Sequence, residues 1–197
     1  MAQPNGTEAI SFDFTFDESL TDLTVSKDEW LRINEKSFDG MASAAVIFDS
    51  QDRVLLIQRA AHDSMPNKWE VPGGAVDPED ISILHGCARE TVEEAGLKAK
   101  HFKRLINEGE GKEKWSVFTN SRGTKIISSF AFEVEVEEGV EVKLDPNEHQ
   151  DWTWVGEEEV KAGVTRDGKR IPLSASMVQN RLSEAFRLRR QDKEKKQ

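Results

Sequence analysis

Three glutamates, Glu90, Glu93 and Glu94, lie close enough in the chain to bind one divalent metal ion together. A helix would bring Glu90 and Glu94 onto adjacent turns, with Glu93 as a third carboxylate beside them. Carboxylate oxygens are preferred ligands of Mg²⁺ and Mn²⁺, and such ions bridge phosphate oxygens and acidify an attacking water. The residues therefore point to metal-assisted phosphate chemistry. The competing interpretation is a solvated acidic helix face, the commoner origin of glutamate-rich turns.

A helix from Leu84 to Ala95 is needed to place these carboxylates. Small or apolar residues recur along it with the spacing of a single helix face: Leu84, Cys87, Ala88, Thr91, Val92 and Ala95. The three glutamates are then expected together on the opposite side, and Gly96 is expected to end the helix. Upstream, residues 69–71 are predicted to form a short strand that Pro72 and a pair of glycines end, so a glycine loop leads towards the helix.

This stretch resembles the Nudix box, whose pattern is G-x5-E-x7-R-E-U-x-E-E-x-G-U, with U a bulky aliphatic residue. The matching positions are Arg89, Glu90, Glu93, Glu94, Gly96 and Leu97, and residues 69–74 are similar to the segment that precedes the box in that family. Thr91 stands where an aliphatic residue is usual, and one residue is inserted between Gly74 and the helix. Either Glu79 or Asp80 therefore corresponds to the first glutamate of the box.

The resemblance implies a role for each matching residue. Glu90, Glu93 and Glu94 would bind Mg²⁺ or Mn²⁺, with the backbone carbonyl of Gly73 as a further ligand. Arg89 would orient these carboxylates through charged hydrogen bonds, which differs little from an ion pair on a helix surface.

Four residues outside the box helix are further candidates. The family often takes another glutamate from a loop, as ligand or general base, and Glu148 is the candidate here; its alternative role is that of a solvated surface charge. The adjacent His149 is interpreted as a loop residue. Arg59, at the end of a predicted strand, is a candidate for phosphate binding together with Gly73 and Gly74, against an alternative role as a surface arginine.

The resemblance implies an α/β fold, the family's α/β/α sandwich around a mixed β-sheet in a single domain. Residues 43–48 and 54–59 are predicted to form a hairpin, residues 28–33 a short helix, and residues 102–106, 115–119, 126–136 and 152–155 further strands. The alternation in 126–136 predicts one buried face.

We expect an N-terminal extension at 1–39, a Nudix hydrolase domain at 40–165, a helix packing on it at 166–190 and a disordered tail at 191–197. In that helix the residues expected to face inward are Val178, Leu182, Ala185 and Phe186.

The amino-acid composition indicates which partners and which cellular location to expect. The formal charge of -10 over 197 residues disfavours nonspecific binding to nucleic acid, which needs a basic face. The single cysteine, Cys87, excludes an internal disulfide and a cysteine-rich zinc site. No apolar run approaches the roughly 20 residues of a membrane-spanning helix, and the first residues do not resemble a signal peptide. We therefore expect a cytoplasmic protein, with the N-terminal extension and the C-terminal helix as candidate homodimer contacts.

The resemblance implies an enzyme that hydrolyses the pyrophosphate linkage of a nucleoside diphosphate joined to another group, such as ADP-ribose or a dinucleoside polyphosphate. Relatives also act on inositol pyrophosphates and oxidised nucleotides, although the acidic balance disfavours highly phosphorylated inositols. A non-catalytic nucleotide-binding module is a second class, disfavoured because all three helix glutamates are present. An isomerase of isoprenoid diphosphates is a third, disfavoured because Cys87 lies in the box helix and not in a separate loop.

Overall fold

The computed structural model describes residues 12–120 and 122–195. Its strands are β1 (Thr15–Phe16), β2 (Gly40–Val46), β3 (Val54–Arg59), β4 (Trp69–Glu70), β5 (Gly73–Ala75), β6 (Ala99–Leu105), β7 (Ser116–Thr119), β8 (Ile126–Val136) and β9 (His149–Val155). Its helices are the 3₁₀ helix η1 (Glu18–Leu23) and the α-helices α1 (Lys27–Ile33), α2 (Ile83–Ala95), α3 (Glu157–Ala162) and α4 (Ser176–Glu194).

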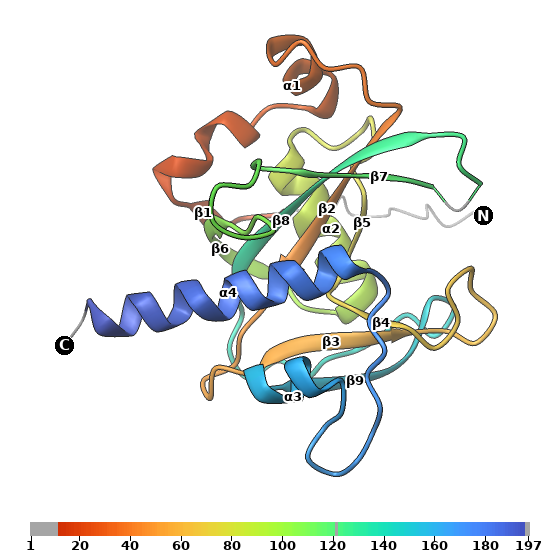
Figure 1. Ribbon diagram of the computed structural model, residues 1–197. Coiled ribbons are helices and arrows are strands. Elements are labelled where there is room, and N and C mark those ends of the chain that lie inside the picture. Colours follow the sequence, from red (N-terminus) through yellow and green to blue (C-terminus); the bar gives the residue numbers. More distant parts are fainter. Residues whose placement is uncertain (1–11, 121, 196–197) are drawn as a thin grey trace, which may run out of the picture.

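A six-stranded mixed sheet with the order β1-β6-β8-β2-β5 forms the centre of the molecule, and β7 pairs with β8 next to β6. β2 runs parallel to β8, whereas β5 pairs antiparallel with β2, and β6 and β7 pair antiparallel with β8. A second, antiparallel sheet has the order β4-β3-β9. The two sheets bring β5 and the start of β9, which are far apart in the sequence, to the same region of the fold (Figure 1).

The predicted hairpin between residues 43–48 and 54–59 is present only next to its turn, where Phe48 and Val54 form an antiparallel bridge and the Leu55 amide donates to the Ile47 carbonyl at 3.0 Å. β2 belongs to the large sheet and β3 to the small one, and the two meet at the bridge between Phe48 and Val54. The first four residues of β3 are all buried. An apolar run that is covered on both faces carries no alternation to show whether its partner is the neighbouring segment or a distant one.

Helices cover both faces of the large sheet, which confirms the α/β/α sandwich (Figure 1). On one face Leu84 of α2 shares a core with Phe130 and Phe132 of β8. On the other, Leu182 of α4 shares a core with Ala131. The expectation that β8 buries one face is therefore wrong for residues 128–134, all of which are buried.

The N-terminal segment packs against the same core. α1 confirms the short helix predicted at 28–33, and the Ser26 side chain caps it by accepting a hydrogen bond from the Glu29 amide. Leu20 and Trp30 are buried in the core that contains α2. Residues 1–11 of the predicted extension lie outside the described part of the chain. The domain boundaries stay a prediction.

α4 confirms the predicted C-terminal helix and its inward residues Val178, Leu182, Ala185 and Phe186, but it continues to Glu194. The disordered tail predicted from residue 191 is therefore wrong for 191–194, while 196–197 lie outside the described residues. Asp192 pairs with Lys103 at 2.7 Å and with Arg104, and Lys193 pairs with Asp52. These pairs hold charged side chains that the sequence alone left without partners.

Two expectations from composition concern Cys87 and the membrane. Cys87 is fully buried on the apolar side of α2, as predicted for a small core residue, and burial raises the pKa of its thiol. Among the described residues, no helix combines the length and the apolar character needed to cross a membrane.

Candidate metal and phosphate site

α2 starts and ends where the sequence signals place it. The side chain of Ser82, which precedes the helix, accepts a hydrogen bond from the His85 amide. Gly96 ends the helix with a left-handed φ of 68°, a conformation that glycine adopts without steric cost. The register of the carboxylates is fixed by the packing of Leu84, Cys87 and Ala88 in the core.

Two of the three box glutamates are buried, contrary to the expectation that all three lie together opposite the core. Glu90 and Glu94 are 9% and 5% exposed, whereas the side chain of Glu93 is 53% exposed. The strand β5 lies against the buried pair. A Cβ on Gly74 would lie 2.6 Å from the Glu90 carboxylate carbon, and the Gly73 amide donates to Glu94 Oε2 at 2.6 Å. The glycine pair thus gives the carboxylates room and holds one of them.

Arg89 orients the carboxylates around it, as the resemblance implies. Its guanidinium donates to Asp80 at 3.1 and 3.0 Å, to Glu90 at 2.9 Å and to Glu93 at 2.8 Å. It also donates to the Ala75 carbonyl at 2.7 Å, which joins the helix to β5. A planar guanidinium with several fixed acceptors restricts the positions of all of them.

Asp80, and not Glu79, faces Arg89 from the loop before the helix. Asp80 is 8% exposed, accepts both bonds from Arg89 and also accepts from the Asp77 amide at 2.8 Å. Glu79 is exposed. Geometry therefore favours Asp80 over Glu79, the choice that the sequence left open: Asp80 is the sixth residue after Gly74, where the pattern has its glutamate, and it makes the contact with a shorter side chain.

Asp80→Ala is expected to lower the free energy of unfolding by about 2–3 kcal/mol, because it removes acceptors from Arg89 and leaves the Asp77 amide unpaired. The matched control is Glu79→Ala at the exposed neighbouring position, expected to change stability by less than about 0.5 kcal/mol. Urea unfolding followed by circular dichroism measures both. Equal losses in the two variants would contradict the assignment of the contact to Asp80.

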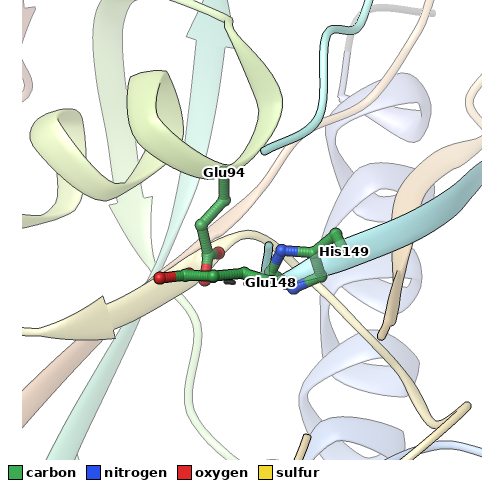
Figure 2. Close-up of side chains that lie close together, drawn as sticks. All are labelled: Glu94, Glu148 and His149. Carbon is green, nitrogen blue, oxygen red and sulfur yellow. Dashed lines mark ion pairs between the residues drawn. The ribbon is translucent and has the colours of Figure 1, made fainter. Parts of the chain in front are cut away.

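At the start of β9, two side chains of types that can bind a metal ion, Glu148 and His149, lie next to Glu94 of α2 (Figure 2). One ligand atom from each of Glu94, Glu148 and His149 lies within 4.8 Å of the other two. His149 was predicted to be a loop residue, but it is the first residue of β9 and is 2% exposed. Its Nε2 lies 3.9 Å from Glu94 Oε1 and 3.6 Å from Glu70 Oε1. Neither ring nitrogen has a hydrogen-bond partner within residues 12–120 and 122–195.

The site concentrates negative charge. Burial raises the pKa of Glu94 to about 9, with further increases from Glu90, Glu70 and Glu148, against the opposing effect of the Gly73 amide. Burial also raises the pKa of Glu90, although Arg89 acts in the opposite direction. Clustered carboxylates beside an imidazole with free nitrogens fit a divalent cation, which would offset their repulsion.

Arg59 lies beside this cluster but is already paired. It contacts Glu70, the last residue of β4, at 2.5 Å and Asp63, in the loop before β4, at 2.6 Å, and these contacts fix its guanidinium. Its proposed contact with substrate stays a prediction, as does the role of the Gly73 carbonyl as a ligand.

A cavity of about 830 Å³ adjoins the carboxylates. Its lining includes Arg59, Glu70, Gly73 and Gly74 next to the cluster, together with residues of β2, β7 and β8 and the beginning of α4. Ligand pockets of about 300–1,000 Å³ hold small organic molecules, so a group of nucleotide size fits here.

Sequence reasoning missed Glu70 as a neighbour of the site and left His149 unassigned. Glu70 precedes the glycine pair by a few residues, within the segment before the box that resembles the family. His149 follows Glu148 directly and precedes an aromatic strand. Two neighbouring polar residues before a predicted strand are a signal that could have identified Glu148 and His149 together.

Comparison with known proteins agrees with this geometry. The model of the NUDIX domain matches residues 39–174. The chain is 26% identical over 148 residues to isopentenyl-diphosphate delta-isomerase idi1 of Aspergillus fumigatus, covering 64% of this chain and 52% of that protein. It is 42% identical over 52 residues to diphosphoinositol polyphosphate phosphohydrolase 2 of Rattus norvegicus, covering 26% of this chain and 27% of that one. The matches thus span about half of the length of the isomerase and about a quarter of the length of the phosphohydrolase.

Among solved structures, the MutT protein of Methanosarcina mazei superimposes with a TM-score of 0.55 at 24% identity, covering 78% of this chain and 95% of that one. The similarity supports the fold. Because the domain model spans more than half of the sequence, including β5, the carboxylate helix α2 and Glu148, this chain belongs to the Nudix family.

Proposed function

We propose that this chain is a metal-dependent hydrolase that cleaves the pyrophosphate linkage of a nucleoside diphosphate joined to another group. The observation that carries the proposal is the convergence of Glu94, Glu148 and His149 within 4.8 Å, next to buried Glu90. Their position beside a cavity of about 830 Å³ gives the organic part of such a substrate a place to bind.

The proposed metal ligands come from α2 and from the start of β9. Glu90, Glu93 and Glu94 would hold Mg²⁺ or Mn²⁺ from the helix, with the Gly73 carbonyl as a further donor. Glu148 and His149 would add donors from the opposite side. A divalent ion held there would polarise the phosphoryl group and lower the pKa of an attacking water.

The remaining groups position these donors or accept a proton. Arg89 holds Glu90 and Glu93 through its guanidinium, and the Gly73 amide holds Glu94. As the alternative to binding the metal, Glu148, which is exposed, can take the proton that a water loses as it attacks. Arg59 and the glycine pair would contact the phosphate groups of the substrate.

The isomerase named among the relatives does not change this proposal. Cys87, the single cysteine of the chain, is fully buried in the core face of α2 and its pKa is raised, so its thiol is not available to a substrate. The match to the inositol phosphohydrolase covers 52 residues and supports its substrate class only as an alternative.

A substrate panel tests the proposal. We expect ADP-ribose or a dinucleoside polyphosphate to be cleaved with Mg²⁺ or Mn²⁺, giving two phosphate-containing products by mass spectrometry, and cleavage to stop with EDTA. The panel also contains an inositol pyrophosphate and an oxidised nucleoside triphosphate as alternative substrates. Binding without cleavage of every compound would overturn the proposal in favour of a nucleotide-binding module.

A further inference from the structure

The long helix α4 begins inside the lining of the large cavity. Ser176, Met177 and Val178, its first residues, all line that cavity. The first amide groups of an α-helix lack a partner one turn earlier in the helix. In α4 the Val178 amide donates to the Ala175 carbonyl at 3.1 Å, whereas the Ser176 and Met177 amides have no hydrogen-bond partner among the described residues, and Ala175 offers no side-chain cap. A 19-residue helix also directs the positive end of its dipole there. The cavity therefore meets free hydrogen-bond donors and a partial positive charge.

A buried arginine lines the same cavity. Arg181 is 4% exposed, and its two terminal nitrogens donate to Ser129 Oγ at 3.0 Å and to the Ser129 carbonyl at 2.5 Å. Its Nε has no hydrogen-bond partner, and no carboxylate of the described residues forms an ion pair with it. Burial lowers the pKa of Arg181 to about 10, with an opposing effect from Glu108. Arg181 therefore has no ion pair among the described residues, and the acidic group that acts on its charge, Glu108, lines the same cavity and accepts a hydrogen bond from Asn180.

Arg181 and the N-terminal residues of α4 line the same cavity. Side chains in an α-helix lean towards its N-terminus. The Arg181 guanidinium donates to Ser129 of β8, which lines the cavity together with Ser176. A buried charge without a paired anion destabilises the protein, and an anion bound next to it offsets most of that effect. The same cavity is lined by Glu70, Gly73 and Gly74, which border the carboxylate cluster.

We propose that Arg181 and the first amide groups of α4 form an anion subsite that binds a second phosphate group of the substrate, separate from the cleaved linkage. This inference rests on the proposed function, because it places the cleaved pyrophosphate at the α2 carboxylates. It narrows the substrate class to organic pyrophosphates in which the part that enters the cavity carries a phosphate monoester.

Pairs of compounds that differ by one phosphate monoester test the inference. Coenzyme A and dephospho-coenzyme A form one pair, and NADPH and NADH form another. In at least one pair, we expect the wild-type protein to cleave the phosphorylated member with a kcat/KM at least about tenfold higher, the effect of one charged hydrogen bond. Arg181→Gln should bring the ratio close to one by losing activity on the phosphorylated member, and Arg181→Lys should restore part of it.

Cleavage of both members of each pair with equal kcat/KM would overturn the inference and leave the proposed hydrolase intact. A ratio that Arg181→Gln does not change would overturn it as well.

A second pair of variants tests the amide groups at the N-terminus of α4 and leaves Arg181 unchanged. Ser176→Pro removes one amide donor but suits the first position of a helix, and the extended backbone of Ala175, with φ of -154° and ψ of 158°, accepts a following proline. Ser176→Ala is the matched control, because it loses the hydroxyl and keeps the amide. We expect the ratio to fall about three- to tenfold in the proline variant and to stay unchanged in the alanine variant.

Binding of inorganic phosphate tests the subsite without turnover. In protein treated with EDTA, phosphate should raise the melting temperature of the wild type above that in chloride at equal ionic strength. This rise should disappear in Arg181→Gln and persist in Glu94→Gln. No rise in the wild type, or an equal rise in Arg181→Gln, would overturn the anion subsite even if no pyrophosphate in the panel were cleaved.

Discussion

Glu94→Gln is expected to reduce metal-dependent turnover by about a thousandfold or more, since losing a metal ligand removes several kcal/mol of transition-state stabilisation. The same substitution should not lower the melting temperature. Glutamine keeps an oxygen that accepts from the Gly73 amide, and the raised pKa of Glu94 shows that burial and the neighbouring Glu90 and Glu70 already favour an uncharged side chain there. Loss of activity at undiminished stability separates a role in the reaction from a role in folding.

The measurements are kcat/KM with Mg²⁺ and Mn²⁺, the affinity for Mn²⁺ by calorimetry, and thermal unfolding. Glu93→Gln should also abolish turnover with the fold intact. Glu79→Gln is the control, because this carboxylate is exposed and lies outside the cluster. Wild-type activity in the Glu94 or Glu93 variant would contradict the assignment of the metal site.

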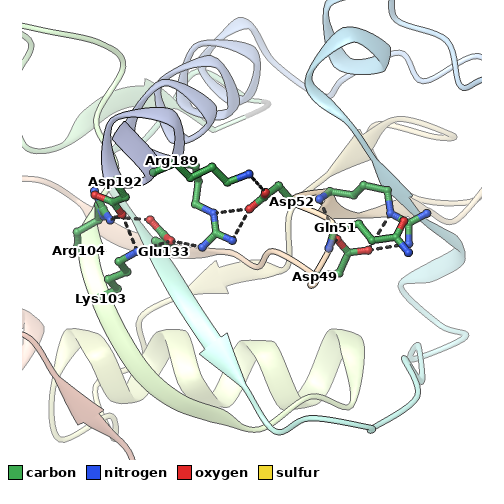
Figure 3. A network of polar contacts seen from close by, with 10 residues as sticks. Asp49, Gln51, Asp52, Lys103, Arg104, Glu133, Arg189 and Asp192 are labelled. Carbon is green, nitrogen blue, oxygen red and sulfur yellow. Dashed lines mark hydrogen bonds and ion pairs between the residues drawn. The ribbon is translucent and has the colours of Figure 1, made fainter. Parts of the chain in front are cut away.

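Glu133→Ala is expected to destabilise the protein by about 3–5 kcal/mol, the cost of breaking a buried charge network. Glu133 is 2% exposed and lies 3.3 Å from Lys103, 3.0 Å from Arg104 and 3.1 Å from Arg189 (Figure 3). Alanine would leave these cations close together without the shared carboxylate. For a chain of this length the melting temperature should fall by about 6–20 °C.

The control for this variant lies in the same strand. Glu135→Ala, two residues further along β8 at an exposed position, should change stability by less than about 0.5 kcal/mol. Glu133→Gln should lie between the two, because it keeps the shape of the side chain but loses its charge. Calorimetric unfolding measures all three variants, and similar melting temperatures for the two alanine variants would rule out the network as a source of stability.

The features that local sequence predicts are those that a short segment determines by itself. The α2 periodicity, its Gly96 end and the strand at 126–136 follow from residues next to one another, and all are present. The burial of Glu94 could not be predicted, because its contacts come from Gly73 and from His149, which are distant in the chain. A helical pattern identifies the side away from the apolar stripe, but not the loop that covers it.

The prediction for the end of α4 is wrong for a similar reason. Its last turns carry mostly charged residues, a composition typical of a disordered tail. Asp52, Lys103 and Arg104 supply opposite charges from elements that precede α4 by many residues, and they stabilise the helix there. Composition records the charges of a segment but not the partners that the fold brings to it.

Asp80 shows how length in the backbone and length in a side chain can substitute for each other. Relative to the family pattern, the loop before α2 has one more residue, and the residue that contacts Arg89 has one methylene fewer than glutamate. The carboxylate still reaches the guanidinium. A motif written with fixed spacing would therefore overlook chains such as this one, whereas a pattern that accepts either acid and allows one more residue between that acid and the arginine would find them.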